Sequence, residues 1–179
     1  MVVEKRYDRK TVYRIMEGVA KEFGIKLVFM NSKEGRGGFN YGGNSGDSIM
    51  IAPFKEGKKG DVVEGIPLDA DCENPLECML LTFFHEFAHC RLSDSVPNSI
   101  KGYSSNGTSR FQYELWITMN GISFALKRGI VFSDSTIGWM LQESKTYIST
   151  DEDAHDFVIA REVSEEGYTT AIDAWWKGK

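Results

Sequence analysis

The sequence predicts an α+β fold, with a small sheet in the N-terminal half and helices in most of the remainder. Three observations predict it: a helical apolar repeat near the N-terminus, two short apolar runs after it, and renewed helical periodicity from about residue 76 onward. The 179 residues are 41% hydrophobic, which is enough for one buried core. We expect one domain over residues 1–179, with a core at about 9–128 and a helical extension at about 129–179.

A first helix is expected over residues 9–23, stopped by Gly24. Its apolar residues lie on one face: Val12, Ile15, Met16, Val19 and Phe23. Residues 25–30 and 48–52 are expected to be strands, with a glycine-rich hairpin at 35–46 between them. A hairpin there can be a plain loop or a flap beside a cleft, where an edge strand pairs with an extended peptide.

The later part of the chain is expected to be mostly helical. Polar residues at 54–75 and 92–108 predict loops around the second helix. The expected helices cover about 76–91, 110–127 and 136–147, a segment after Thr150 and a short segment at 165–176.

Composition excludes some classes of partner. A formal net charge of −5 and a pI of about 5.3 argue against nucleic acid as the main partner, because phosphate binding needs a basic face. No apolar run is long enough to span a membrane, and the N-terminus lacks the apolar stretch of a signal peptide. The cysteines, Cys72, Cys78 and Cys90, are few and odd in number, which predicts reduced thiols and a cytoplasmic location.

The most informative segment is His85-Glu86-Phe87-Ala88-His89, in the second expected helix. Two histidines four residues apart lie on the same face of a helix, so both imidazoles can bind one zinc ion. Glu86 can reach a water on that zinc and remove its proton, which makes Glu86 the candidate catalytic base.

A catalytic zinc site needs a third protein ligand and keeps one position open. Glu114 is the preferred candidate, because it begins a helical stripe whose other members are small: Thr118, Gly121 and Ala125. Small residues allow the second helix to approach closely, which would bring Glu114 to the metal. His155 is the alternative third ligand, and the other carboxylates considered are Glu143 and those from Asp151 to Asp156.

The residue that stabilises the oxyanion is left open among four side chains, because most tyrosines pack rather than react. They are Tyr103, Tyr113, Tyr147 and His155.

The HEFAH motif followed by Glu114 on the next long helix resembles the glutamate-zincin metallopeptidases, and most closely the ImmA/IrrE-type group of phages and mobile elements. The resemblance covers about residues 9–128. It implies a zincin-like fold, Zn²⁺ held by His85, His89 and Glu114, and Glu86 as the base. It further implies an endopeptidase that cuts a specific intracellular protein.

Two other functions are kept open. Residues 129–179 have no counterpart in the family pattern, and Glu114 is followed by a bulky run rather than small residues. Both features suit a binding or regulatory module with a zinc-site fold and little hydrolysis. A zinc hydrolase acting on another kind of bond would carry the same motif. The oligomeric state is not predicted.

Overall fold

The computed structural model describes residues 7–29, 42–44, 46–51, 62–63, 66–67, 74–93 and 110–144. These residues form a mixed, mostly helical fold with a small sheet. The elements in chain order are α1 (Arg9–Glu22), β1 (Lys26–Phe29), β2 (Gly42–Asn44), β3 (Ser48–Ile51), β4 (Val62–Val63), β5 (Ile66–Pro67), α2 (Pro75–Arg91), α3 (Arg110–Lys127) and α4 (Asp134–Ser144).

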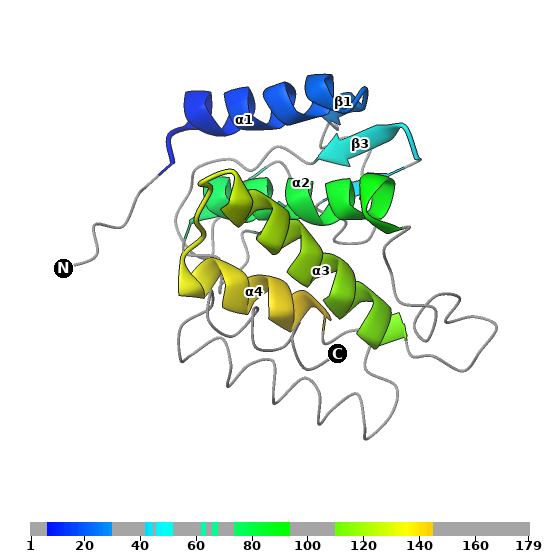
Figure 1. Cartoon of the computed structure of the whole chain (residues 1–179). Helices are drawn as coiled ribbons and strands as arrows, with labels where there is room; N and C mark the ends of the chain where they lie inside the picture. Colours follow the sequence, from blue (N-terminus) through cyan, green and yellow to red (C-terminus); the bar gives the residue numbers. More distant parts are fainter. Residues whose placement is uncertain are drawn as a thin grey trace.

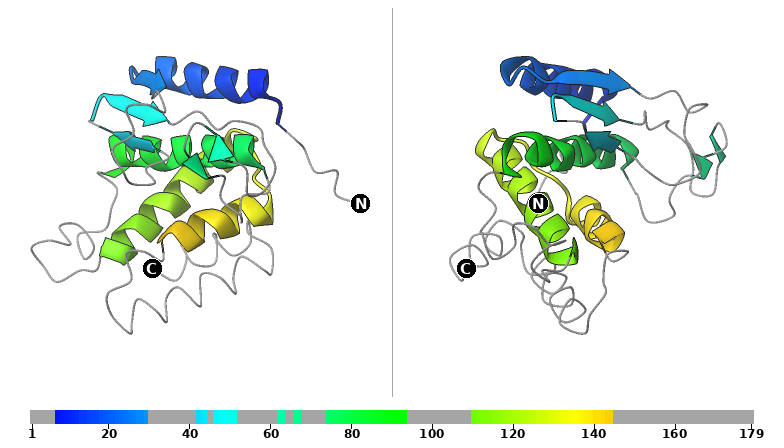
Figure 2. Two further views of the ribbon diagram at one scale, coloured as in Figure 1. Left: turned by 180° about the vertical axis from the view of Figure 1, so that it is seen from behind. Right: turned by 90° about the vertical axis from the view of Figure 1, so that its right-hand side faces the viewer.

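The elements are stacked in layers (Figures 1 and 2). Helix α1 contacts β1 and α2, and α2 in turn contacts β2 and β3. Helices α3 and α4 pack on the side of α2 that faces away from the sheet. Helix α2 therefore lies at the centre of the fold, between the sheet and the two later helices.

The main sheet has three strands in the order β1-β3-β2. Strand β3 pairs in parallel with β1, with Leu27 opposite Ile49, and antiparallel with β2, with Gly43 opposite Met50. Residues 42–44 of the expected hairpin form β2, which pairs with β3, whereas residues 35–41 and 45 lie outside the described residues. The flap interpretation of the glycine-rich segment required an edge strand at this position, and β3 is not one, because it has a hydrogen-bonded neighbour on both sides.

Helix α1 follows its predicted boundaries closely. Asp8 caps its N-terminus, where the carboxylate accepts a hydrogen bond of 2.7 Å from the backbone N–H of Thr11. Val12, Met16 and Val19 are buried on the predicted apolar face. Gly24 follows the helix with φ of +63°, a left-handed conformation that favours glycine and ends the helix as expected.

Helix α2 is apolar around most of its circumference, as a helix enclosed by other elements must be. Two residues favour the start of the helix at this point. The side chain of Asn74 caps it by accepting a hydrogen bond of 3.2 Å from the N–H of Glu77, and Pro75 occupies the first turn. Phe83, Phe84 and Phe87 are fully buried. The rings of Phe87 and Phe124 of α3 contact each other in a tilted arrangement, with centroids 4.6 Å apart. These aromatic contacts fix α2 against α3.

A buried carboxylate joins α2 to the start of α4. Glu77 is 3% exposed and accepts hydrogen bonds from the N–H of Ser133 at 2.8 Å, the hydroxyl of Ser133 at 2.6 Å and the hydroxyl of Thr136 at 2.7 Å. Ser133 also caps α4, because its Oγ accepts from the N–H of Thr136 at 3.3 Å. The helix therefore begins at Asp134 rather than at the predicted Thr136.

Two further sequence predictions need correction. The loop expected over 54–75 is wrong at Val62–Val63 and Ile66–Pro67, which pair as antiparallel strands too short to show an apolar repeat. The expectation of reduced thiols is wrong for Cys78, which is disulfide-bonded, whereas Cys90 is free. Disulfide formation depends on the distance between two Cα atoms, which cysteine spacing does not report. Cys72 lies outside the described residues.

Candidate metal centre

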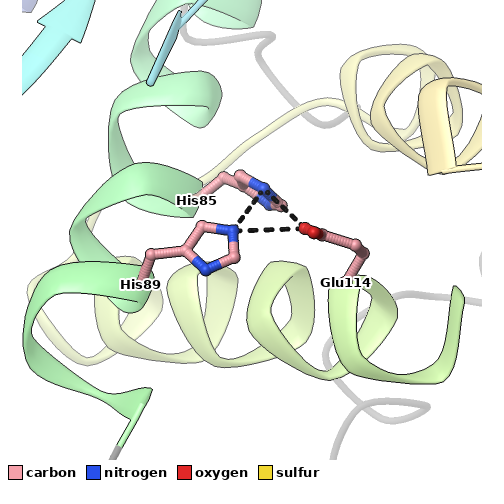
Figure 3. A group of neighbouring side chains, drawn as sticks. All are labelled: His85, His89 and Glu114. Carbon is pink, nitrogen blue, oxygen red and sulfur yellow. Dashed lines mark hydrogen bonds and ion pairs between the residues drawn. The ribbon is translucent and has the colours of Figure 1, made fainter. Parts of the chain in front are cut away.

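Two helices supply the three predicted ligands (Figure 3). His85 and His89 project from the same face of α2, with ring centroids 4.8 Å apart. Glu114 reaches toward them from the first turns of α3, and Figure 3 shows its carboxylate and the two imidazoles turned toward one another. The structure thus brings together the three residues that the sequence suggested as metal ligands.

The three inward-facing atoms form a nearly equilateral triangle. The Nε2 atoms of His85 and His89 are 3.2 Å apart, and Oε2 of Glu114 lies 3.4 Å from the first and 3.2 Å from the second. Ligands about 2.0–2.1 Å from a tetrahedral zinc lie about 3.3–3.4 Å from one another. The donor types and their spacing therefore both fit a three-ligand zinc site.

Close packing of α2 and α3 makes this triangle possible. The stripe of small residues that follows Glu114 on α3 is buried, as predicted from the sequence. A Cβ atom built on Gly121 would lie 2.6 Å from the backbone oxygen of Phe84, the residue before His85. Only glycine fits at that distance, so Gly121 sets the separation of the two helices one residue away from a ligand.

Hydrogen bonds and charge keep Glu114 ionised despite its burial. Its side chain is 9% exposed. Burial by itself raises the pKa of the carboxyl, but the hydrogen bonds and charges of His85 and His89 outweigh that effect and lower the pKa from 4.5 to about 2. Arg110, one turn earlier on α3, lies 3.7 Å from the other carboxylate oxygen and adds a partly exposed positive charge. Glu114 is therefore a carboxylate at neutral pH, the form that binds a metal.

Two hydroxyl groups of α3 contact the outer nitrogens of the histidines. The Oγ1 of Thr118 lies 2.9 Å from Nδ1 of His85, and the hydroxyl of Tyr113 lies 3.5 Å from Nδ1 of His89. Sequence reasoning missed both contacts. The available signal was that Thr118 lies one helical turn after Glu114, but there it counted only as a small residue.

The remaining predicted residues have different outcomes. Glu86 lies on α2 between the two histidines and is partly exposed. The hydroxyl of Tyr113 contacts the outer side of His89, away from the triangle, so this placement does not serve an oxyanion. Other candidates lie outside the described residues, namely His155, Tyr103, Tyr147, the carboxylates from Asp151 to Asp156 and the side chain of Glu143.

No known protein family, curated protein or solved structure matches the chain. Among the described helices, none has both the length and the apolar character of a membrane span.

Proposed function

We propose that this chain is a zinc-dependent peptidase, with His85, His89 and Glu114 as metal ligands and Glu86 as the general base. The observation that carries the proposal is the triangle of two imidazole nitrogens and one carboxylate oxygen, with edges of 3.2, 3.2 and 3.4 Å. Three such donors leave one tetrahedral position open, which is the arrangement of catalytic rather than structural zinc.

The reaction needs a nucleophile and a group that moves its proton. Zinc, when bound, supplies Lewis-acid chemistry and lowers the pKa of water. Glu86 is close in sequence to both ligands, and the residue is partly exposed. In the proposed mechanism Glu86 takes a proton from the attacking water and gives it to the nitrogen of the scissile bond. The C–N bond then breaks, and the product leaves as a neutral amine rather than as an amide anion.

A peptide is the proposed substrate because the HEFAH motif with Glu114 resembles the glutamate-zincin peptidases. The same resemblance suggests a specific intracellular protein as the target. A cytoplasmic location stays a prediction, and the disulfide at Cys78 removes the cysteine count as its support.

The test compares wild-type protein with Glu86→Gln. Both are loaded with one equivalent of zinc and incubated with a peptide library derived from a bacterial proteome, and new peptide termini are read by mass spectrometry. We expect Glu86→Gln to keep its zinc and to cleave about 10²–10⁴-fold more slowly, the usual effect of losing a general base.

The matched control is Glu17→Gln, which neutralises an exposed glutamate on α1 and should cleave at the wild-type rate. Undiminished cleavage by zinc-loaded Glu86→Gln would sink the assignment of the base. A wild-type protein that binds zinc and produces no new termini would contradict the peptidase proposal and favour the binding or regulatory module.

A further inference from the structure

One helix, α3, contacts both ring nitrogens of each histidine. The Glu114 carboxylate lies beside the two Nε2 atoms, and two hydroxyl groups lie beside the two Nδ1 atoms. Each histidine directs Nε2 into the triangle and Nδ1 away from it. The two outer nitrogens therefore have separate partners on the same helix, Thr118 for His85 and Tyr113 for His89.

We propose that Thr118 and, more weakly, Tyr113 are positioning residues that hold His85 and His89 in the tautomer and ring orientation that bind zinc through Nε2. The inference rests on the proposed metal centre. It goes further by assigning the groups that support its ligands, which are hydroxyls rather than the carboxylates often found behind zinc-binding histidines.

The chemistry follows from the proton count of imidazole. A neutral histidine carries one N–H, and a metal needs the lone pair of the other nitrogen. When Nδ1–H donates to the oxygen of Thr118, the lone pair of Nε2 is free and points into the triangle. The opposite tautomer carries its proton on Nε2, so the lone pair that the metal needs would lie on Nδ1, outside the triangle.

The two contacts differ in strength. Thr118 is 0% exposed and its hydroxyl lies 2.9 Å from Nδ1 of His85, so water cannot replace it. Tyr113 is only partly buried, and its 3.5 Å contact with His89 is at the limit of a hydrogen bond. We therefore expect the loss of the Thr118 hydroxyl to have the larger effect on zinc affinity.

The experiment measures zinc affinity by competition with a chromophoric chelator for wild type, Thr118→Val, Thr118→Ser and Tyr113→Phe. Valine has the shape of threonine without its hydroxyl, whereas serine keeps the hydroxyl. We expect Thr118→Val to bind zinc about 10- to 100-fold more weakly, Thr118→Ser to bind within about threefold of wild type, and Tyr113→Phe to fall between them.

A matched control comes from α2. Thr82 is also buried in a helix, and its hydroxyl bonds the backbone oxygen of Cys78 at 2.9 Å, away from the triangle. Thr82→Val should therefore leave zinc affinity unchanged. If Thr118→Val does not fold by circular dichroism, Thr118→Ala removes the same hydroxyl with less steric demand.

A second readout reports the hydrogen bond itself. In zinc-loaded, ¹⁵N-histidine-labelled protein, the Nδ1 proton of His85 should exchange slowly with water in wild type and Thr118→Ser, and rapidly in Thr118→Val. Wild-type zinc affinity in Thr118→Val, or coordination of His85 through Nδ1, would overturn the inference while leaving the zinc site in place. Failure of the wild-type protein to bind zinc would instead overturn the proposed function.

Discussion

At the residue scale, Glu114 shows how its surroundings select one ionic form. A glutamate buried to this degree would ordinarily take up a proton, and its pKa would rise. The two imidazoles facing it reverse that effect and hold the pKa at about 2. The carboxylate thus adds the negative charge that a divalent cation needs, beside two imidazoles, which bind a metal in their neutral form.

Replacement of Glu114 by glutamine tests this contribution. Glutamine keeps the size of the side chain and removes its charge, so the amide oxygen is a much poorer zinc ligand. Since changes behind a ligand already cost about 10- to 100-fold in metal affinity, we expect Glu114→Gln to weaken zinc binding by at least about 100-fold in the chelator competition.

Glu17→Gln, an exposed neutralisation on α1, should bind zinc as wild type does. Equal zinc affinity in Glu114→Gln and Glu17→Gln would contradict the role of Glu114 as the third ligand.

Sequence reasoning reached the ligands but not the groups that support them. His85 and His89 are set by spacing on one helix, which geometry fixes in advance. Glu114 was reachable through the small residues that follow it. The contacts of Thr118 and Tyr113 with the histidines depend on the offset and rotation of α3 against α2, which no local pattern encodes.

At the element scale, the long helices were predictable because each carries several turns of apolar repeat and a capping or stopping residue. The bounds predicted for α3 agree with the structure, with Gly129 in a left-handed conformation just beyond it. The two-residue strands β4 and β5 were not predictable, because two residues are too few for an alternating pattern.

The contact between α2 and α3 is the element-scale feature on which the site depends most. Gly121→Ala would place a methyl group 2.6 Å from the backbone oxygen of Phe84, so the helices must separate next to His85. Overpacking of this kind costs about 1–3 kcal/mol. We expect Gly121→Ala to lower the free energy of unfolding by that amount and to weaken zinc binding at least about tenfold.

The control is Gly18→Ala, at an exposed position of α1 where a Cβ would meet nothing within 4 Å. Because alanine is the better helix former, this variant should be about 0.5–1 kcal/mol more stable in urea denaturation. Stabilisation of Gly121→Ala by a similar amount, with unchanged zinc affinity, would show that the close approach of the helices is not required.

At the scale of the whole molecule, the ligand-bearing helix is also the central element of the core. Two arginine side chains form hydrogen bonds between the elements around this helix. Arg91, at the end of α2, donates to the backbone oxygens of Phe23 at 3.2 Å and Gly46 at 3.1 Å. Arg128 forms a bidentate pair with Glu22 that joins the region after α3 to α1. The histidines therefore project from a backbone held on several sides, which favours a preformed site.

The fold class was predictable at this scale as helices around a small sheet, whereas the middle position of β3 was not. Its residues alternate in burial, with Ile49 and Ile51 fully buried, and that pattern suits an edge or a central strand equally well. Strand order depends on pairing between segments distant in sequence.

The proposed metal centre is tested by a crystal structure of the zinc-soaked protein, with anomalous diffraction recorded on both sides of the zinc absorption edge. We expect one zinc ion bound by Nε2 of His85, Nε2 of His89 and the Glu114 carboxylate, at about 2.0–2.2 Å from each. A zinc ion bound by the histidines without Glu114, or no anomalous peak between α2 and α3, would contradict it.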